Sequence, residues 1–309
     1  MHPAVDSARM RRLTVRVDFL RPTSWPDALA AKAENPDAVP ILGGTDVMVE
    51  LNFDKRRPPA LLDLTAVPEL AEWEDADGMI RLGAGVSYTR VIDELGDVLP
   101  GLAMASRTVG SPQIRNRGTV GGNLGASSPA GDSHPPLLAA GARVEVASVR
   151  GSRMLPVEDF YTGPKANALE PGELVAATHV PRASGPQQFA KIGTRNAMVI
   201  AVTAFALALH PDRKQVGTGI GSAAPTPRRA PEAEEFLAGE LDAAGLWESR
   251  AALPDPLVEA FGEHVARCAA PIDDVRGTAA YRLHALAVMA RRSLRWAWQD
   301  YRVEGERAA

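Results

Sequence analysis

The chain has 309 residues, of which 45% are hydrophobic and 23% charged, so it can fold into two or three compact units with real cores. Its net charge of −4 at pH 7 argues against non-specific binding to nucleic acid, which requires a basic surface. A single cysteine, Cys268, excludes an internal disulfide framework, a structural zinc site made of cysteines and a cysteine-ligated iron–sulfur cluster within this chain.

Residues 1–12 contain no apolar stretch of the length that a signal peptide needs. No window of the sequence approaches the roughly 20 apolar residues of a membrane span. We therefore expect a soluble, cytoplasmic protein that binds neither membrane nor nucleic acid.

Up to about residue 66 the sequence predicts a β-α-β unit. A short alternating strand at 15–20 is followed by a helix that is capped by Thr23 or Ser24 and runs to Glu34. Two further strands are predicted at 39–42 and 60–64, with a short helix at 47–52 between them.

From residue 67 the pattern favours antiparallel strands. We expect a hairpin with an acidic turn at 75–78, then two helices, a long loop, a short helix and three strands, at 89–95, 99–108, 109–136, 137–140, 142–147, 153–160 and 173–180. Gly83-Ala-Gly-Val-Ser87 begins like a dinucleotide fingerprint, but no third glycine follows at the required place, which disfavours a Rossmann fold.

A polar, proline-bracketed segment at 181–187 predicts a domain boundary. Beyond it, the glycine run at 217–227 leads into prolines instead of a helix, so it indicates a sheet edge or bend and not a phosphate site. Helices are predicted at 230–239 and 257–266, and a long amphipathic helix at 283–298.

The most specific chemical signal lies in the glycine-rich segment 109–136. Turns of this composition can take positive φ and point successive N–H groups at phosphate oxygens. Asp132 adds an acceptor suited to sugar-like hydroxyls, and several prolines predict a rigid loop instead of a helix. A glycine-rich surface loop without a ligand is the alternative. The glycines of the segment that we expect to permit positive φ are Gly118, Gly121, Gly122, Gly125 and Gly131.

A second turn of this kind, Leu42-Gly-Gly-Thr-Asp46, follows a predicted strand and opens toward a helix. Two such turns could hold the two phosphates of one pyrophosphate. This hypothesis requires segments that are far apart in the sequence to meet on one ligand.

Together with Thr119-Val-Gly-Gly-Asn123 and Ser128-Pro-Ala-Gly-Asp132, this turn resembles the FAD pyrophosphate motifs of a known family. These are the flavoprotein, or medium, subunits of molybdenum hydroxylases, the group of xanthine dehydrogenase and carbon monoxide dehydrogenase. The resemblance runs from about residue 17 to about residue 302.

The resemblance implies an α+β fold. A PCMH-type FAD-binding domain at 13–183 would contain two α/β subdomains, at about 13–66 and 67–183. A C-terminal α+β domain like that of carbon monoxide dehydrogenase flavoproteins would follow at 187–304.

Carried over position by position, the resemblance places FAD between the two subdomains. Asp132 would bind ribityl or ribose hydroxyls, and Val109 and Val175 would pack against rings. Related flavoproteins have a lysine and an arginine at the positions of Lys191 and Arg195, near the flavin or its oxidant. These two are the candidate catalytic residues, with Lys191 also a cofactor contact. The two turns would contribute Leu42, Gly43, Gly44, Thr45, Asp46 and Val47 on one side and Thr119, Val120, Gly121, Gly122 and Asn123 on the other.

The six histidines are scattered without metal-ligand spacing, so no metal site is predicted. The resemblance implies that the molybdenum cofactor belongs to a large subunit and the [2Fe-2S] clusters to a small subunit, both separate polypeptides of a heterotrimer. This chain would be a xanthine dehydrogenase-like electron-transfer subunit, passing electrons from those clusters through FAD to NAD or another acceptor. The alternatives are a self-contained flavin oxidase or reductase of the same fold, and a cofactor-free assembly module whose glycine turns are structural only.

Overall fold

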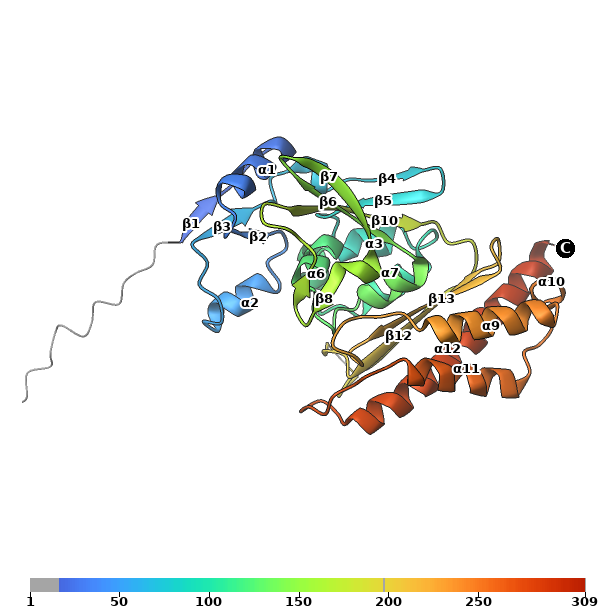
Figure 1. Cartoon of the computed structure of the whole chain (residues 1–309). Coiled ribbons are helices and arrows are strands. Elements are labelled where there is room, and N and C mark those ends of the chain that lie inside the picture. Colours follow the sequence, from blue (N-terminus) through green and yellow to red (C-terminus); the bar gives the residue numbers. More distant parts are fainter. Residues whose placement is uncertain (1–16, 197, 309) are drawn as a thin grey trace, which may run out of the picture.

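The computed structural model describes residues 17–196 and 198–308, which form three units, each built around a sheet (Figure 1). The N-terminal unit has a parallel three-stranded sheet in the order β1-β3-β2, which is the predicted β-α-β arrangement. The predicted strand at 15–20 begins outside the described residues. The elements of this unit are β1 (Asp18–Leu20), α1 (Trp25–Glu34), β2 (Val39–Ile41), α2 (Val47–Asn52) and β3 (Ala60–Asp63).

Local sequence signals account for the bounds of α1. The Ser24 side chain accepts a hydrogen bond from the Asp27 backbone N–H at 3.3 Å, which satisfies one of the free donors of the first turn. The helix ends at Glu34, because Asn35 leaves the helical conformation and Pro36 follows it. The predicted cap and both ends of this helix are confirmed.

The middle unit has an antiparallel five-stranded sheet in the order β4-β5-β10-β6-β7. Asp77 and Gly78 both have positive φ in the tight turn that joins the predicted hairpin. Alternate residues such as Leu82 and Val144 are buried, whereas their neighbour Arg81 is half-buried on the opposite face. The strands are β4 (Trp73–Ala76), β5 (Met79–Gly83), β6 (Arg143–Ser148), β7 (Gly151–Pro156) and β10 (Leu174–Pro181).

Helices cover the buried face of this sheet, and two expectations about them are wrong. The segment 109–136 is not a loop throughout, because Ser111 and Thr119 each cap a short helix through the side-chain oxygen. The strand predicted at 153–160 ends at Pro156 and is followed by a helical turn, α8 (Val157–Phe160). The other helices of the unit are α3 (Tyr88–Glu94), α4 (Pro100–Arg107), α5 (Pro112–Arg117), α6 (Val120–Ala126) and α7 (His134–Ala140), and a small hairpin consists of β8 (Tyr161–Gly163) and β9 (Ala166–Asn167).

The glycines of this segment also differ from expectation. None of the five that were expected to permit positive φ adopts a left-handed conformation. Gly121 lies inside α6, where an added Cβ would lie 2.5 Å from the Cα of Ala84, so this glycine serves close packing of the helix against the end of β5.

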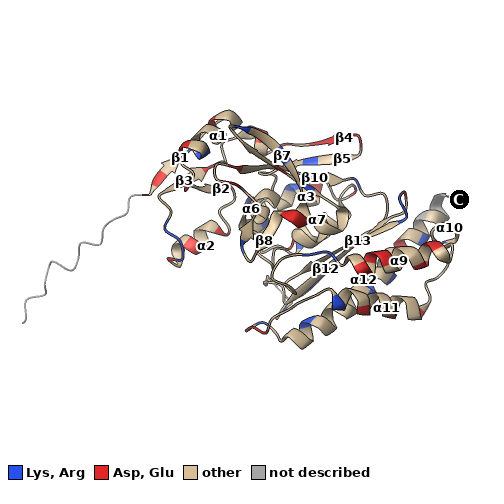
Figure 2. Cartoon of the chain, in the orientation of Figure 1, with Lys and Arg blue, Asp and Glu red and all other residues tan. Residues whose placement is uncertain are grey.

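The C-terminal unit has an antiparallel sheet in the order β11-β12-β13, with helices over one face (Figure 1). The glycine run at 217–221 lies in the edge strand β13, as predicted. Basic and acidic residues are interspersed over the elements of all three units (Figure 2). No helix within the described residues combines the length and apolarity needed to cross a bilayer. The elements are β11 (Gln187–Ile192), β12 (Thr203–His210), β13 (Gln215–Gly221), α9 (Pro231–Ala243), α10 (Leu246–Ser249), α11 (Asp255–Arg267) and α12 (Ala279–Ala308).

Candidate functional site

A cleft of about 950 Å³ is formed between the N-terminal and middle units. The turn that joins β2 to α2 forms one wall, and residues of α6 and the start of β10 form another. Part of the loop between β11 and β12, including Arg195 and Ile200, reaches the cleft from the C-terminal unit. All three units therefore contribute to one site.

The two glycine turns meet directly at this cleft. A Cβ added to Gly43 would lie 1.9 Å from the carbonyl oxygen of Arg117 and 3.0 Å from the Cα of Gly118, so only glycine allows this contact between backbones. The adjacent Gly44 has a φ of +73°, a left-handed conformation that starts the turn into α2. Segments distant in the sequence thus form one continuous surface, as the pyrophosphate hypothesis requires.

The second turn is fixed by its own cap. The Thr119 hydroxyl accepts a hydrogen bond from the Gly122 N–H at 2.9 Å and holds the first turn of α6 in place. On the opposite wall, Asp46 precedes α2 and makes no capping hydrogen bond with its side chain. Burial raises the pKa of the Asp46 carboxyl, against the opposite effect of nearby Lys165.

Asp132 is the most informative polar group of the site. It is 8% exposed, and its Oδ2 accepts hydrogen bonds from Lys191 Nζ at 2.5 Å and from the Thr108 hydroxyl at 3.1 Å. Its Oδ1 is buried and has no hydrogen-bond partner among the described residues. Burial raises the pKa of the Asp132 carboxyl, and the ammonium of Lys191 opposes that shift. A buried acceptor in a cleft wall is satisfied when a ligand hydroxyl donates to it.

Most of the site residues predicted from the sequence line the cleft, and two do not. Val120 is fully buried behind the wall that its neighbours form. Lys191 lies behind Asp132 and contacts that carboxylate without lining the cleft itself. Those that line the cleft are Leu42, Gly43, Gly44, Thr45, Asp46, Val47, Val109, Thr119, Gly121, Gly122, Asn123, Asp132, Val175 and Arg195.

One ion pair at the cleft was not predicted from the sequence. Lys165 Nζ, in the turn between β8 and β9, lies 2.7 Å from Glu50 Oε1 on α2, and both residues line the cleft. The hydrogen bond from Lys165 lowers the pKa of the Glu50 carboxyl. No local pattern could have predicted this pair, because its members belong to different units and neither lies in a recognisable motif.

The lining residues fit an extended cofactor with a charged centre and apolar rings. The two backbone turns can hold a diphosphate, the unpartnered oxygen of Asp132 can accept from a sugar-like hydroxyl, and Val109 and Val175 offer apolar contact. This combination on an α+β frame fits one class of protein, the flavoproteins that bind a dinucleotide cofactor.

Comparison with known families identifies the group within that class. Residues 14–183 match the FAD binding domain in molybdopterin dehydrogenase, and residues 188–297 match the CO dehydrogenase flavoprotein C-terminal domain. The chain belongs to the FAD-binding flavoproteins of the molybdenum hydroxylase family and is a component of an oxidoreductase.

Individual relatives align with this chain over most of their own length. The chain is 31% identical to the xanthine dehydrogenase FAD-binding subunit of Escherichia coli O157:H7, covering 89% of this chain and 93% of that protein. It is 28% identical to the nicotine 6-hydroxylase medium subunit of Paenarthrobacter nicotinovorans, with coverages of 90% and 96%. Among solved structures, a chain of the reconstituted CO dehydrogenase from Oligotropha carboxidovorans superposes with a TM-score of 0.84 at 28% identity, over 92% of this chain and 98% of that one.

Proposed function

We propose that this chain is the electron-transfer subunit of a cytoplasmic, xanthine dehydrogenase-like molybdenum hydroxylase, with NAD as the terminal acceptor. Its partners would be a large subunit with the molybdenum cofactor and a small subunit with iron–sulfur clusters. The observation that carries the proposal is the meeting of two glycine turns beside the unpartnered carboxylate oxygen of Asp132. The likeness to subunits of xanthine dehydrogenase and nicotine 6-hydroxylase supports an assembly of several chains.

Bound FAD would supply the redox chemistry, since a flavin exchanges single electrons with iron–sulfur centres and electron pairs with a nicotinamide. The protein would bind and orient that cofactor. Segments 43–46 and 119–123 would hold its diphosphate, and Asp132 would accept from a hydroxyl. Lys191 would keep Asp132 ionised and oriented, because the two groups are 2.5 Å apart and nearly buried.

Arg195 would act at the rim of the cleft. Its Nε and Nη2 donate to the carbonyl oxygen of Met198 at 2.9 and 2.6 Å, which folds the loop back and fixes the guanidinium. The remaining donors of this cation are suited to phosphate groups of a nicotinamide dinucleotide. We therefore assign the approach of the acceptor to this side of the cleft.

The test is anaerobic reduction of the purified native complex with NADH. The reaction is monitored by the loss of flavin absorbance. We expect rapid bleaching in the wild type and a higher NADH concentration for half-maximal rate in Arg195→Met, with the flavin content unchanged. Flavin that responds to hydroxylation substrates but never to NADH would reject NAD as the acceptor. Failure to recover a molybdenum-containing chain and a cysteine-rich chain in the complex would reject the proposed partners.

The alternative of a self-contained flavin oxidase with a tethered flavin finds no support at this cleft. None of the described residues that line it is a histidine. His134 is fully buried, where its Nδ1 is 2.9 Å from the Tyr161 hydroxyl. We therefore expect denaturation to release the flavin intact, as absorbance of the supernatant after acid precipitation would report.

A further inference from the structure

The two faces of the C-terminal sheet carry side chains of very different size. The face toward α9, α11 and α12 is made of large apolar residues and forms the core of this unit. The face toward α7 and α4 of the middle unit presents three alanines on β12 and three glycines on β13, with the larger His210 and Gln215 following at one end. The residues of this small-residue face are Ala204, Ala206 and Ala208 on β12 and Gly217, Gly219 and Gly221 on β13.

The small-residue face lets the backbone of α7 lie directly on β13. A Cβ added to Gly219 would lie 2.0 Å from the carbonyl oxygen of Pro135, and one added to Gly217 would lie 1.9 Å from that of Ala139. Both contacts are with backbone atoms, which cannot move aside as the end of a side chain can. Any larger residue at these positions must push the C-terminal unit away from α7.

The same sheet carries Lys191. In the strand register Lys191 pairs with Ala204, and Ala204 pairs with Gly221, so the three residues form one row on one face. The chain after Gly221 also reaches the site, because the Ser222 N–H donates to the carbonyl oxygen of Pro129 at 2.8 Å. Pro129 belongs to the turn that ends at Asp132. One end of this row, at Gly221, therefore adjoins the contact with the turn of Asp132. At the other end, the Lys191 ammonium donates to the Asp132 carboxylate.

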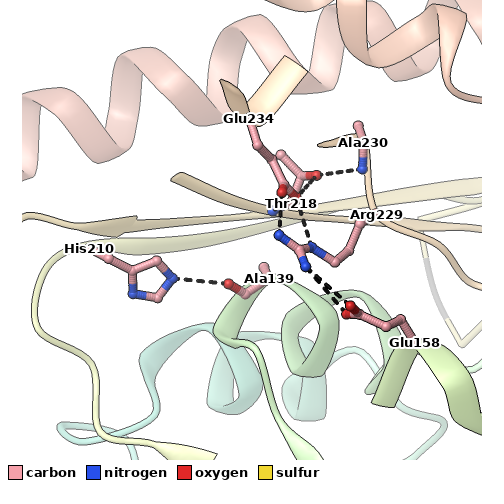
Figure 3. Close-up of polar contacts among 7 residues, drawn as sticks. All are labelled: Ala139, Glu158, His210, Thr218, Arg229, Ala230 and Glu234. Carbon is pink, nitrogen blue, oxygen red and sulfur yellow. Dashed lines mark hydrogen bonds and ion pairs between the residues drawn. The ribbon is translucent and has the colours of Figure 1, made fainter. Parts of the chain in front are cut away.

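Polar contacts fasten the two units at the edge of the same sheet (Figure 3). Arg229 forms a partly buried ion pair with Glu234 of α9, and its Nη1 lies 3.3 and 3.4 Å from the two carboxylate oxygens of Glu158 on α8. Glu234 is held in turn by the Thr218 hydroxyl and N–H, at 2.7 and 2.8 Å. Near the C-terminal end of α7, His210 Nε2 is 3.1 Å from the carbonyl oxygen of Ala139.

We propose that this interface positions Lys191 for its work on Asp132. Gly219 and Glu158 are positioning residues: neither lines the cleft, and together they set how near the Lys191 ammonium comes to the carboxylate. The proposal rests on the proposed role of Lys191 in the function above. It extends that function by making the affinity for FAD depend on the contact between the two domains.

The test compares FAD dissociation from four full-length proteins: wild type, Gly219→Ala, Lys191→Met and the double variant. Dissociation is followed by the rise in flavin fluorescence after dilution. We expect Gly219→Ala and Lys191→Met each to accelerate dissociation about tenfold and the double variant to be no faster than Lys191→Met, since both act through one contact. Gly239→Ala is the matched control, because a Cβ there meets no atom within 4 Å.

Glu158→Gln provides a second route if Gly219→Ala does not fold. It removes the charge that joins the two units at their edge and adds no atom to the core. We expect a smaller acceleration than with Gly219→Ala, again absent in the Lys191→Met background, and a shift of the acid limb of FAD binding toward higher pH. Multiplicative effects in either double variant, or normal dissociation in both single variants, would overturn the proposal. These measurements use no NADH and no partner subunit, so their failure is distinguishable from failure of the proposed function.

Discussion

Two glycine-rich stretches of this chain look alike in sequence and have different surroundings. At the cleft, a Cβ on Gly125 would meet nothing within 4 Å, and one on Gly122 would meet only the Thr119 hydroxyl. In β13, a Cβ on Gly217 or Gly219 would collide with the backbone of α7 at about 2 Å. A glycine that faces open space leaves room for a ligand, whereas a glycine that faces backbone brings two parts of the protein together. Substitutions at Gly122 and Gly125 should affect the cofactor, and those at Gly217 and Gly219 should affect the contact between units.

The largest expected effect is that of Gly122→Val. The added side chain enters the cleft beside the diphosphate turns, so we expect loss of FAD from the purified protein. Because little protein surrounds this position, the melting temperature of the apoprotein should stay within a few degrees of wild type, since ~1 kcal/mol shifts a domain of this size by only about 2–4 °C. Flavin content and a thermal melt check both points, and normal flavin occupancy would contradict the placement of the phosphate turn.

Asp132→Asn should have the next largest effect. The amide keeps the size of the side chain and removes its charge, so the strong hydrogen bond expected from a cofactor hydroxyl is weakened and Lys191 loses its partner. A charge-assisted hydrogen bond contributes about 1.5–3 kcal/mol, which corresponds to roughly 10- to 100-fold in affinity. Titration of the apoprotein with FAD measures it. Unchanged affinity would mean that the free Oδ1 faces no cofactor donor.

Lys191→Met should change the pH dependence of FAD binding. Burial already raises the pKa of Asp132, and the ammonium of Lys191 counteracts part of that shift, so its removal should raise this pKa further. Binding that requires the ionised carboxylate is then lost at a higher pH as the solution is acidified. The dissociation constant for FAD, measured in steps from pH 8 to pH 5, should begin to rise at a higher pH in the variant than in the wild type. If FAD binding were lost at the same pH in the variant and the wild type, Lys191 would not influence the pKa of Asp132.

His134 lies in the protein interior and should affect stability instead of binding. Burial lowers the pKa of His134 from 6.5 to about 3, so the unfolded chain binds a proton in this range that the folded chain does not. The stability due to this residue is complete above about pH 6.5 and declines on acidification toward pH 3, by up to ~1.4 kcal/mol per pH unit. His134→Gln should flatten that slope in urea unfolding experiments between pH 6.5 and 4.5. An identical slope in the variant would show that other groups cause it.

The smallest effect is expected from the ion pair at the cleft. Lys165 is more than half exposed, so its pair with Glu50 is screened by solvent and contributes at most about 1 kcal/mol. Lys165→Met should therefore accelerate FAD dissociation by less than about fivefold and less still at high salt. A larger change would mean that the pair controls access to the cleft.

Local signals in the sequence sufficed for much of the fold. The Ser24 cap, the Asp77-Gly78 turn and the spacing of apolar residues located α1, the β4–β5 hairpin and the long C-terminal helix. The short helices α5 and α6 were missed because their proline and glycine content concealed good caps at Ser111 and Thr119. The N-cap preference of threonine is a signal at Thr119 that could have identified the start of α6.

The motifs predicted which residues gather at the candidate site but not which of them lie behind the wall of the cleft. Most of the site residues that the motifs predicted line the cleft, because each motif is local, but many other lining residues, such as Glu50 and Lys165, were not predicted. The position of Lys191 behind Asp132 depends on the register of β11, β12 and β13 and on how α7 lies across them. The contact between Gly219 and Pro135 likewise depends on two units whose relative placement no local pattern encodes.

The complete burial of α7 bears on how this chain can be divided or recombined. Every residue from His134 to Ala140 is buried, partly by β13 of the C-terminal unit, so a fragment ending near residue 183 would present an uncovered apolar helix and should aggregate. Chimeras that take their C-terminal half from another flavoprotein should fold only when the donor also has glycine or alanine at the six positions of the small-residue face. The volume of the side chains on β12 and β13 therefore indicates whether an N-terminal and a C-terminal part are compatible. This criterion can be applied before any gene is assembled.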